Sequence, residues 1–241
     1  MSQFFGRNTA MMAQANANVS PRTRSEQSAF IHRTFGWMAI GLAVTGLVAL
    51  GVSQSAQAVK TLAHSWVLLI ILQLGIGLGL QFAISRISSA LATMLFLAYS
   101  ATIGLTIAIL LLVFTTASVF SAFFITAGTF GAMALWGMFT KADLTRLGGI
   151  AGMALIGLVI AMVVNMFMHA QGLEFFINIA GVLIFTALTA YDTQRIKYMY
   201  LVGPENSEAS KKASIMGAFM LYLDFINLFI FILQFMGQQR E

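Results

Sequence analysis

The chain has 241 residues, of which 59% are hydrophobic and 9% are charged, and its mean hydropathy is +0.87. Soluble domains carry roughly 25% charged residues, so this composition excludes a soluble domain. It predicts an all-α polytopic membrane protein. The formal net charge of +5 describes loops beside anionic lipid and gives no reason to expect a nucleic-acid partner. The absence of cysteine excludes disulfides and cysteine-ligated metal sites.

Seven apolar runs follow a polar N-terminal stretch. Residues 1–33 are rich in Asn, Gln and Ser and lack the apolar core of a cleaved signal peptide. We therefore expect a cytoplasmic tail over 1–33 and a single transmembrane domain over 34–241. Each run is close to the length that crosses about 30 Å of hydrocarbon, and none shows the short alternating segments of a β-barrel. The predicted spans are 34–53, 65–85, 90–113, 117–139, 149–168, 174–191 and 213–236.

Glycine has two expected roles in this chain. Gly203, followed by Pro204, indicates a turn in the longest internal loop, which we predict over 193–212. Other glycines are spaced for close helix contact within the bilayer, because a residue without a side chain lets two backbones approach. These are Gly75, Gly77, Gly79, Gly128, Gly131, Gly148, Gly149, Gly152 and Gly157.

The cations separate when the loops are assigned alternately to the two sides of the membrane. The side opposite the N-terminus receives only Lys60 and Arg240. The positive-inside rule therefore predicts a cytoplasmic N-terminus, an external C-terminus and, for a bacterial protein, the inner membrane. Eleven cations fall on the side of the N-terminus: Arg7, Arg22, Arg24, Arg33, Arg86, Lys141, Arg146, Arg195, Lys197, Lys211 and Lys212.

Two carboxylates in the last two spans need an explanation. Asp224 lies in an otherwise uncharged run, and Asp192 closes the preceding run in the string TALTAYDTQR. An acid at membrane depth is costly, so it usually marks an ion path, a proton relay or a buried partner. Asn227 shares a helix face with Asp224, and Asn178 lies 14 residues before Asp192, which is close to four turns. The polar pair predicts that the seventh span lies inside the bundle.

Helix tilt decides whether the two aspartates meet, because Asp192 lies at the cytoplasmic end of its span and Asp224 about 16 Å into the next. If they meet, they titrate as a coupled pair and form a proton-sensitive site with weak Ca²⁺ contact. Arg86 ends the second span on the same side of the membrane. A guanidinium binds a carboxylate bidentately, so Arg86 could latch Asp192 or Asp224. The alternative is that Arg86 is an ordinary positive-inside anchor.

The strings AYDTQRIK (190–197) and LYLDFINLF (221–229) resemble the Bax inhibitor family, also called the transmembrane Bax inhibitor motif family, and its bacterial members in particular. TAGTFGAMALWG (126–137), TKADL (140–144) and the seven-span layout fit as well. The resemblance implies six helices around a central seventh and a pH-sensitive calcium leak channel. It also implies that Asp192 and Asp224 form a hydrogen-bonded pH sensor. The family's latching arginine corresponds to Arg86, counted back from Gly104 of the third span.

Three classes of function are considered. The first is passive, proton-regulated permeation with Ca²⁺ as the permeant ion and no cofactor. The second is an interaction protein that modulates membrane proteases or stress and cell-death responses. An enzyme is not expected, because the chain has neither G-x-S-x-G nor G-x-x-x-x-G-K. The expected partners are the lipid bilayer, Ca²⁺, protons and other membrane proteins.

Overall fold

The fold is a bundle of long helices. A computed structural model of the protein describes residues 21–202 and 207–238. Seven of the helices in this part of the chain are long and apolar enough to cross a membrane, which confirms the prediction of a seven-helix all-α membrane protein. In chain order the helices are α2 (Pro21–Ser53), α3 (Ala56–His64), α4 (Trp66–Ala83), α5 (Ser89–Val113), α6 (Thr116–Phe139), α7 (Thr145–Met168), α8 (Gln171–Met199), a 3₁₀ turn (Tyr200–Val202) and α9 (Glu208–Met236).

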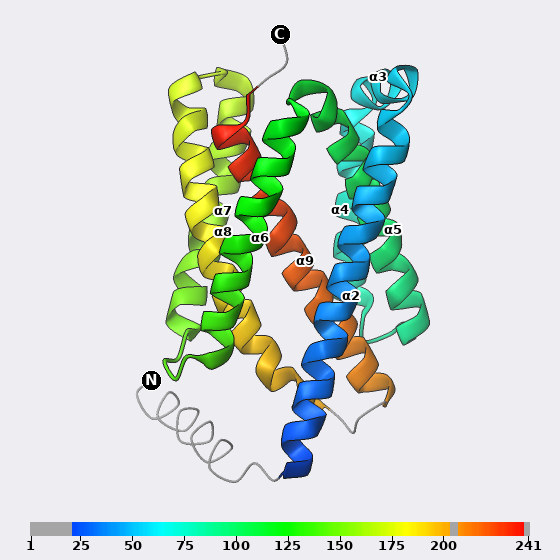
Figure 1. The fold of residues 1–241 in the computed structure, drawn as a ribbon, viewed down its shortest axis with the longest axis vertical. Helices are drawn as coiled ribbons and strands as arrows, with labels where there is room; N and C mark the ends of the chain where they lie inside the picture. The colour runs from blue at the N-terminus through cyan, green and yellow to red at the C-terminus, as the bar shows by residue number, and fades with distance from the viewer. Residues whose placement is uncertain (1–20, 203–206, 239–241) are drawn as a thin grey trace.

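Helix α9 runs through the middle of the bundle. It crosses obliquely from the lower right to the upper left of Figure 1, and it contacts α2, α5, α6 and α8, whereas α4 packs on α5 and α7 on α8. In its most apolar window 72% of the residues are buried, against 39% or less in the other six spans. The central position expected for the seventh span is confirmed.

Hydroxyl groups join α2 to α9 inside the bundle. Thr34 Oγ1 lies 3.1 Å from Ser214 Oγ. Eleven residues further along α2, Thr45 Oγ1 lies 2.6 Å from the hydroxyl of Tyr222. All four side chains are buried. Because no water competes for polar groups inside a bilayer, such pairs favour one register of the two helices over others.

Helix α2 begins earlier than expected. It starts at Pro21, so residues 21–33 of the expected polar tail continue the first membrane helix, and residues 1–20 lie outside the described part of the chain. Phe30, Thr34 and Met38 are buried at four-residue intervals. This is the pattern of a helix with one buried face, and it is concealed in the sequence by Arg33 and by the charged residues that precede Phe30.

The loop predicted over 193–212 is wrong at both ends. Helix α8 continues to Met199 and α9 begins at Glu208, so Asp192 lies within a helix rather than at its end. Ile196, beyond the predicted end of the span, is buried at 1% exposure, and this burial extends the helix by tertiary packing rather than by lipid contact. The expected turn at Gly203 and Pro204 lies outside the described residues.

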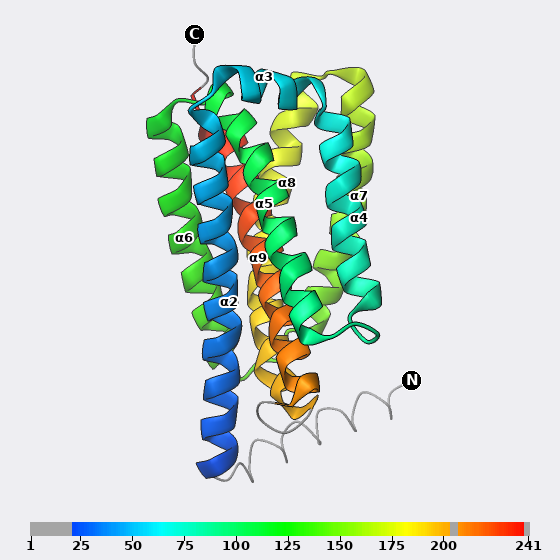
Figure 2. The same ribbon diagram turned by 90° about the vertical axis from the view of Figure 1, so that its right-hand side faces the viewer.

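Helix α3 is an element that the sequence analysis did not expect. It lies across the top of the bundle in Figure 2, between the upper ends of α2 and α4. Ser55 caps it by accepting a hydrogen bond from the backbone N–H of Ala58 at 3.3 Å, and Val59 is its fully buried residue. With nine residues it is too short to span the bilayer.

Two of the nine glycines assigned to helix packing make the expected close contact. A Cβ on Gly77 would lie 3.2 Å from the ring of Tyr99, and one on Gly148 would meet the ring of Tyr191. At the other seven positions a Cβ would have no neighbouring heavy atom within 4 Å. The packing prediction is wrong for those seven, because spacing alone does not reveal which face of a span is turned outward.

Candidate functional site

The carboxyl groups of Asp192 on α8 and Asp224 on α9 interact directly. Asp224 is 4% exposed and Asp192 is half-buried, and each side chain is within hydrogen-bonding reach of the other. An ionised carboxylate only accepts hydrogen bonds, so a bond between the two requires a proton on one of them. The structure thus answers the question that helix tilt left open.

Two features of the fold bring these residues together. Because α8 continues to Met199, Asp192 lies about 10 Å inside the helix, measured along its axis. Because α9 crosses the bundle obliquely (Figure 1), the distance of Asp224 along α9 overstates its depth. The early start of α9 at Glu208 places Asp224 about 24 Å along its own helix, so the longer α8 and the oblique course of α9 together bring the two residues to one level.

Glycines of two neighbouring helices hold α8 immediately before Asp192. Gly137 of α6 approaches the backbone of Ala190 so closely that a Cβ on the glycine would meet the carbonyl oxygen. Gly148 of α7 lies against the ring of Tyr191 in the same way. Close backbone approach of this kind requires the smallest residue on one of the two helices. The position of Asp192 is therefore set by α6 and α7 as well as by α9.

The cation that acts on Asp192 is Arg195, three residues further along α8. Arg86 is exposed in the turn between α4 and α5, and its side chain makes no hydrogen bond or ion pair with the residues that the structure describes. That turn is fastened to the start of α9, because Ser89 Oγ donates a hydrogen bond to Glu208 at 2.9 Å. The latch by Arg86 stays a prediction. Arg195 was missed because the helix was expected to end at Tyr191.

The two asparagines expected to support the aspartates make no hydrogen bond to them among the described residues. Asn227 Nδ2 donates to the carbonyl oxygen of Leu223 in its own helix at 2.8 Å. Asn178 is buried, but it lies about 21 Å from Asp192 along α8, toward the other end of the bundle. Among the described residues, neither asparagine hydrogen-bonds to an aspartate.

Thr193 is a polar residue next to the pair that the sequence analysis did not single out. It is 1% exposed, and its Oγ1 and the Oδ2 atom of Asp224 have no hydrogen-bond partner within the described segments. Most buried polar atoms are paired, so unpaired ones often mark a place that an ion, a proton or water occupies. Thr193 falls in the predicted loop over 193–212, where a threonine carries no signal by itself, which is why burial was needed to find it.

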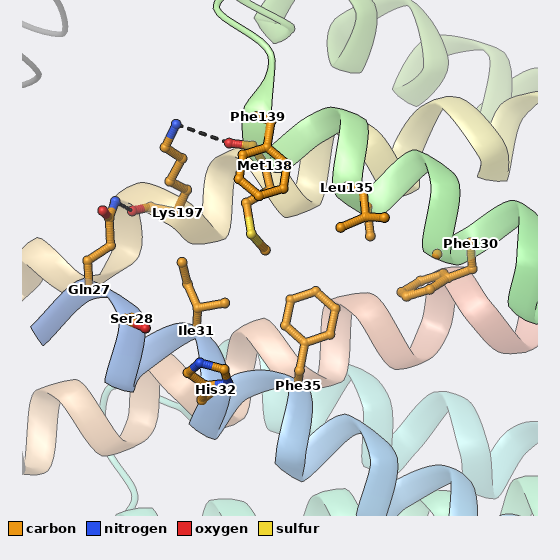
Figure 3. Close-up of a pocket in the computed structure, with 12 residues that line it drawn as sticks. Gln27, Ser28, Ile31, His32, Phe35, Phe130, Leu135, Met138, Phe139 and Lys197 are labelled. Carbon is orange, nitrogen blue, oxygen red and sulfur yellow. Dashed lines mark hydrogen bonds between the residues drawn. The ribbon is translucent and has the colours of Figure 1, made fainter. Parts of the chain in front are cut away.

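A lateral groove of about 690 Å³ opens between α2 and α6 near the lower end of the bundle. Figure 3 shows Phe35 and Ile31 of α2 facing Met138 of α6 across this groove. At its polar end, Lys197 Nζ donates to the carbonyl oxygen of Met138 at 3.1 Å, and Gln27 Nε2 donates to the carbonyl oxygen of Lys197 at 2.8 Å. Neither aspartate lines the groove, so it is separate from the carboxyl pair.

The carboxyl pair could hold a cation only weakly. In the described ranges, no three His, Asp or Glu side chains gather in a group that could bind a metal ion. Ca²⁺ takes six to eight oxygen ligands. Asp192 and Asp224 supply a fraction of these, and water or backbone carbonyl oxygens would have to supply the rest.

Known proteins are similar in sequence to this chain over most of its length. Residues 27–241 match the family described as Inhibitor of apoptosis-promoting Bax1. The inner membrane protein YbhL of Escherichia coli K12 is 40% identical over 94% of this chain and 98% of its own. Uncharacterised proteins of Borreliella burgdorferi and Deinococcus radiodurans are also each 40% identical, over 88% and 95% of this chain and 93% and 98% of their own.

Proposed function

Because the chain belongs to the Bax inhibitor family, we propose that it is a pH-sensitive calcium leak channel of the bacterial inner membrane, gated by Asp192 and Asp224. The observation that carries this proposal is the direct contact of two carboxyl groups on the central helix and its neighbour. The inner-membrane location rests on the seven apolar helices and on the name of the E. coli relative.

Protons and Ca²⁺ compete for the same oxygen atoms in this proposal. With one proton between them, Asp192 and Asp224 are hydrogen-bonded and carry one negative charge. With none, they carry two negative charges that repel each other and attract a divalent cation. The two groups therefore titrate as a unit, and pH sets both the charge and the separation of the pair. Loose coordination suits conduction, because a permeant ion must also leave.

The proposed latch involves a cation that pairs with the carboxyl group in one state and leaves it in another. Arg86 takes this role by resemblance, and Arg195 is the alternative that its position beside Asp192 supports. Replacing the latch should shift the pH at which flux changes, because the latch favours the ionised carboxylate. Ca²⁺ flux is measured against pH in Arg86→Gln and in Arg195→Gln, and a shifted pH dependence identifies the arginine that serves as the latch. If the pH dependence is unchanged in both variants, neither arginine is a latch.

The proposal is tested by reconstituting the full chain into liposomes that contain a Ca²⁺-sensitive dye. We expect Ca²⁺ entry above that of empty liposomes, and reduced or altered entry in the double variant Asp192→Asn/Asp224→Asn. Asp143→Asn is the control for replacing an aspartate outside the pair, because Asp143 is exposed in the turn between α6 and α7. An absence of entry at every pH would leave the interaction role as the better hypothesis.

A further inference from the structure

The lateral groove between α2 and α6 is lined mostly by apolar side chains. Its walls come from residues 27–35 of α2 and residues 130–139 of α6, and Lys197 of α8 lies at one end. Helix α2 packs on α5 and α9, whereas α6 packs on α8 and α9, so the two walls are held by other neighbours. The volume of about 690 Å³ falls within the roughly 300–1,000 Å³ of small-molecule sites.

The groove opens on a face of the bundle that a bilayer covers. Leu135 and Phe139, on its α6 side, are 57% and 74% exposed, so these apolar side chains lie against lipid when the protein is in a membrane. Gly131 belongs to the same wall, and a Cβ built on it would have no heavy atom within 4 Å. Empty space of this kind forfeits dispersion contacts, and the hydrocarbon region holds no water to fill it. An acyl chain is therefore the expected filling.

The length of the groove matches one leaflet of a bilayer. Residues 130–139 of α6 extend about 14 Å along the helix axis, which is close to half of the roughly 30 Å of hydrocarbon. These residues are the last turns of α6, and they face the first half of α2. The groove thus begins near one surface of the membrane and ends near its middle, which is the course of a single acyl chain.

The polar end of the groove carries a positive charge that no acidic side chain balances. Figure 3 shows Gln27 and Lys197 together at this end. Lys197 Nζ donates one hydrogen bond, to the carbonyl oxygen of Met138, and an ammonium group has two further N–H bonds to offer. Among the described residues no carboxylate pairs with Lys197, and neither Asp nor Glu lines the groove. Glu26 lies near Tyr200 instead.

We propose that this groove binds an anionic glycerophospholipid, with one acyl chain between α2 and α6 and the phosphate group at Lys197. Basic pockets between transmembrane helices bind acidic lipid head groups in this way. The imidazole of His32 and the hydroxyl group of Ser28, on exposed residues of the groove wall, offer further hydrogen bonds to phosphate oxygens. The site includes neither Asp192 nor Asp224, so it does not rest on the proposed channel.

Lipid binding is measured by native mass spectrometry of the full-length protein, delipidated in detergent and titrated with phosphatidylglycerol or phosphatidylcholine of equal chain length. We expect the parent protein to bind one phosphatidylglycerol more tightly than phosphatidylcholine. Lys197→Gln should weaken phosphatidylglycerol binding about fivefold and leave phosphatidylcholine binding unchanged, since one cation at the membrane surface contributes about this factor. Lys211→Gln is the matched control, because it removes the same charge from an exposed residue of α9 outside the groove.

Gly131→Leu tests the acyl chain rather than the head group. The new side chain enters the groove from its wall, and no protein atom obstructs its Cβ, so the variant is expected to fold. It should weaken the binding of both lipids about tenfold, because the leucine takes the space of several methylene groups of the chain. Gly128→Leu, three residues earlier on α6, also has open space around its Cβ. Because Gly128 does not line the groove, this control should leave binding unchanged.

Three results would overturn the lipid site. The first is equal affinity of the parent protein for the two lipids, and the second is phosphatidylglycerol binding that resists Gly131→Leu. The third is a dimer of the parent protein that Gly131→Leu converts to a monomer without changing lipid binding, because a second copy of the chain would then cover the groove. Lipid binding with the expected responses supports the site even if liposomes show no Ca²⁺ flux, a result that would overturn the channel alone.

Discussion

Tyr222 ties three helices together through its hydroxyl group. Thr45 Oγ1 is 2.9 Å from the carbonyl oxygen of Ser100 and 3.0 Å from that of Gly41. The hydroxyl group of Thr45 therefore donates its one proton to a carbonyl oxygen. Tyr222, at 2.6 Å, must then donate to Thr45 Oγ1. The arrangement joins α2, α5 and α9 one turn or less from the level of Asp224.

Tyr222→Phe should lower the free energy of unfolding by about 1 kcal/mol, because it removes one buried hydrogen bond while Thr45 keeps a carbonyl partner. Unfolding by SDS in mixed micelles measures this change. Tyr99→Phe is the matched control, since the hydroxyl of Tyr99 makes no hydrogen bond with any described residue. Equal losses in the two variants would contradict the assigned role of the Tyr222 hydroxyl.

The helices could largely be predicted from the sequence, and their extensions could not. Hydropathy locates the seven spans because lipid imposes one length on every crossing. The first turns of α2 and the last turns of α8 carry charged residues, and they stay helical because Phe30 and Ile196 are buried against other helices. Such tertiary burial leaves only a weak periodic signal in the chain. The contact of Asp192 with Asp224 likewise depends on helix tilt, which no residue pattern encodes.

Helix α8 should be sensitive to substitution where glycine brings α6 against it. Gly137→Ala places a Cβ against the carbonyl oxygen of Ala190, and a backbone atom cannot move aside cheaply. We expect a loss of about 1–3 kcal/mol in the free energy of unfolding, as for overpacking elsewhere. Gly131→Ala, on the same helix with no heavy atom within 4 Å of the added Cβ, should be neutral or slightly stabilising. Thermal unfolding in detergent compares the two, and equal stability would contradict the close approach of α6 and α8.

At the scale of the whole molecule, the odd number of spans places the start of α2 and the end of α9 at opposite ends of the bundle, as Figures 1 and 2 show. The distribution of cations predicts which end is cytoplasmic. With a cytoplasmic N-terminus, the end of α9 would face outward and the α4–α5 turn inward.

The absence of cysteine makes the orientation directly measurable. Gln54→Cys and Ala142→Cys each introduce one thiol at an exposed residue, the first beside α3 and the second in the turn between α6 and α7. In right-side-out vesicles, a membrane-impermeant maleimide should label the cysteine at position 54 at once and the one at position 142 only after permeabilisation. The reverse pattern would invert the bundle and place the end of α9 on the cytoplasmic side.

The central claim is that Asp192 and Asp224 act as one proton-sensitive unit in a calcium leak. The most direct measurement is Ca²⁺ flux into proteoliposomes at several pH values around neutrality, for the parent protein, Asp192→Asn, Asp224→Asn and the double variant. We predict that flux varies with pH in the parent and loses this dependence in each single variant, with little further change in the double variant, because coupled groups share a proton. A parent flux that is independent of pH, or additive effects of the two substitutions, would contradict the claim.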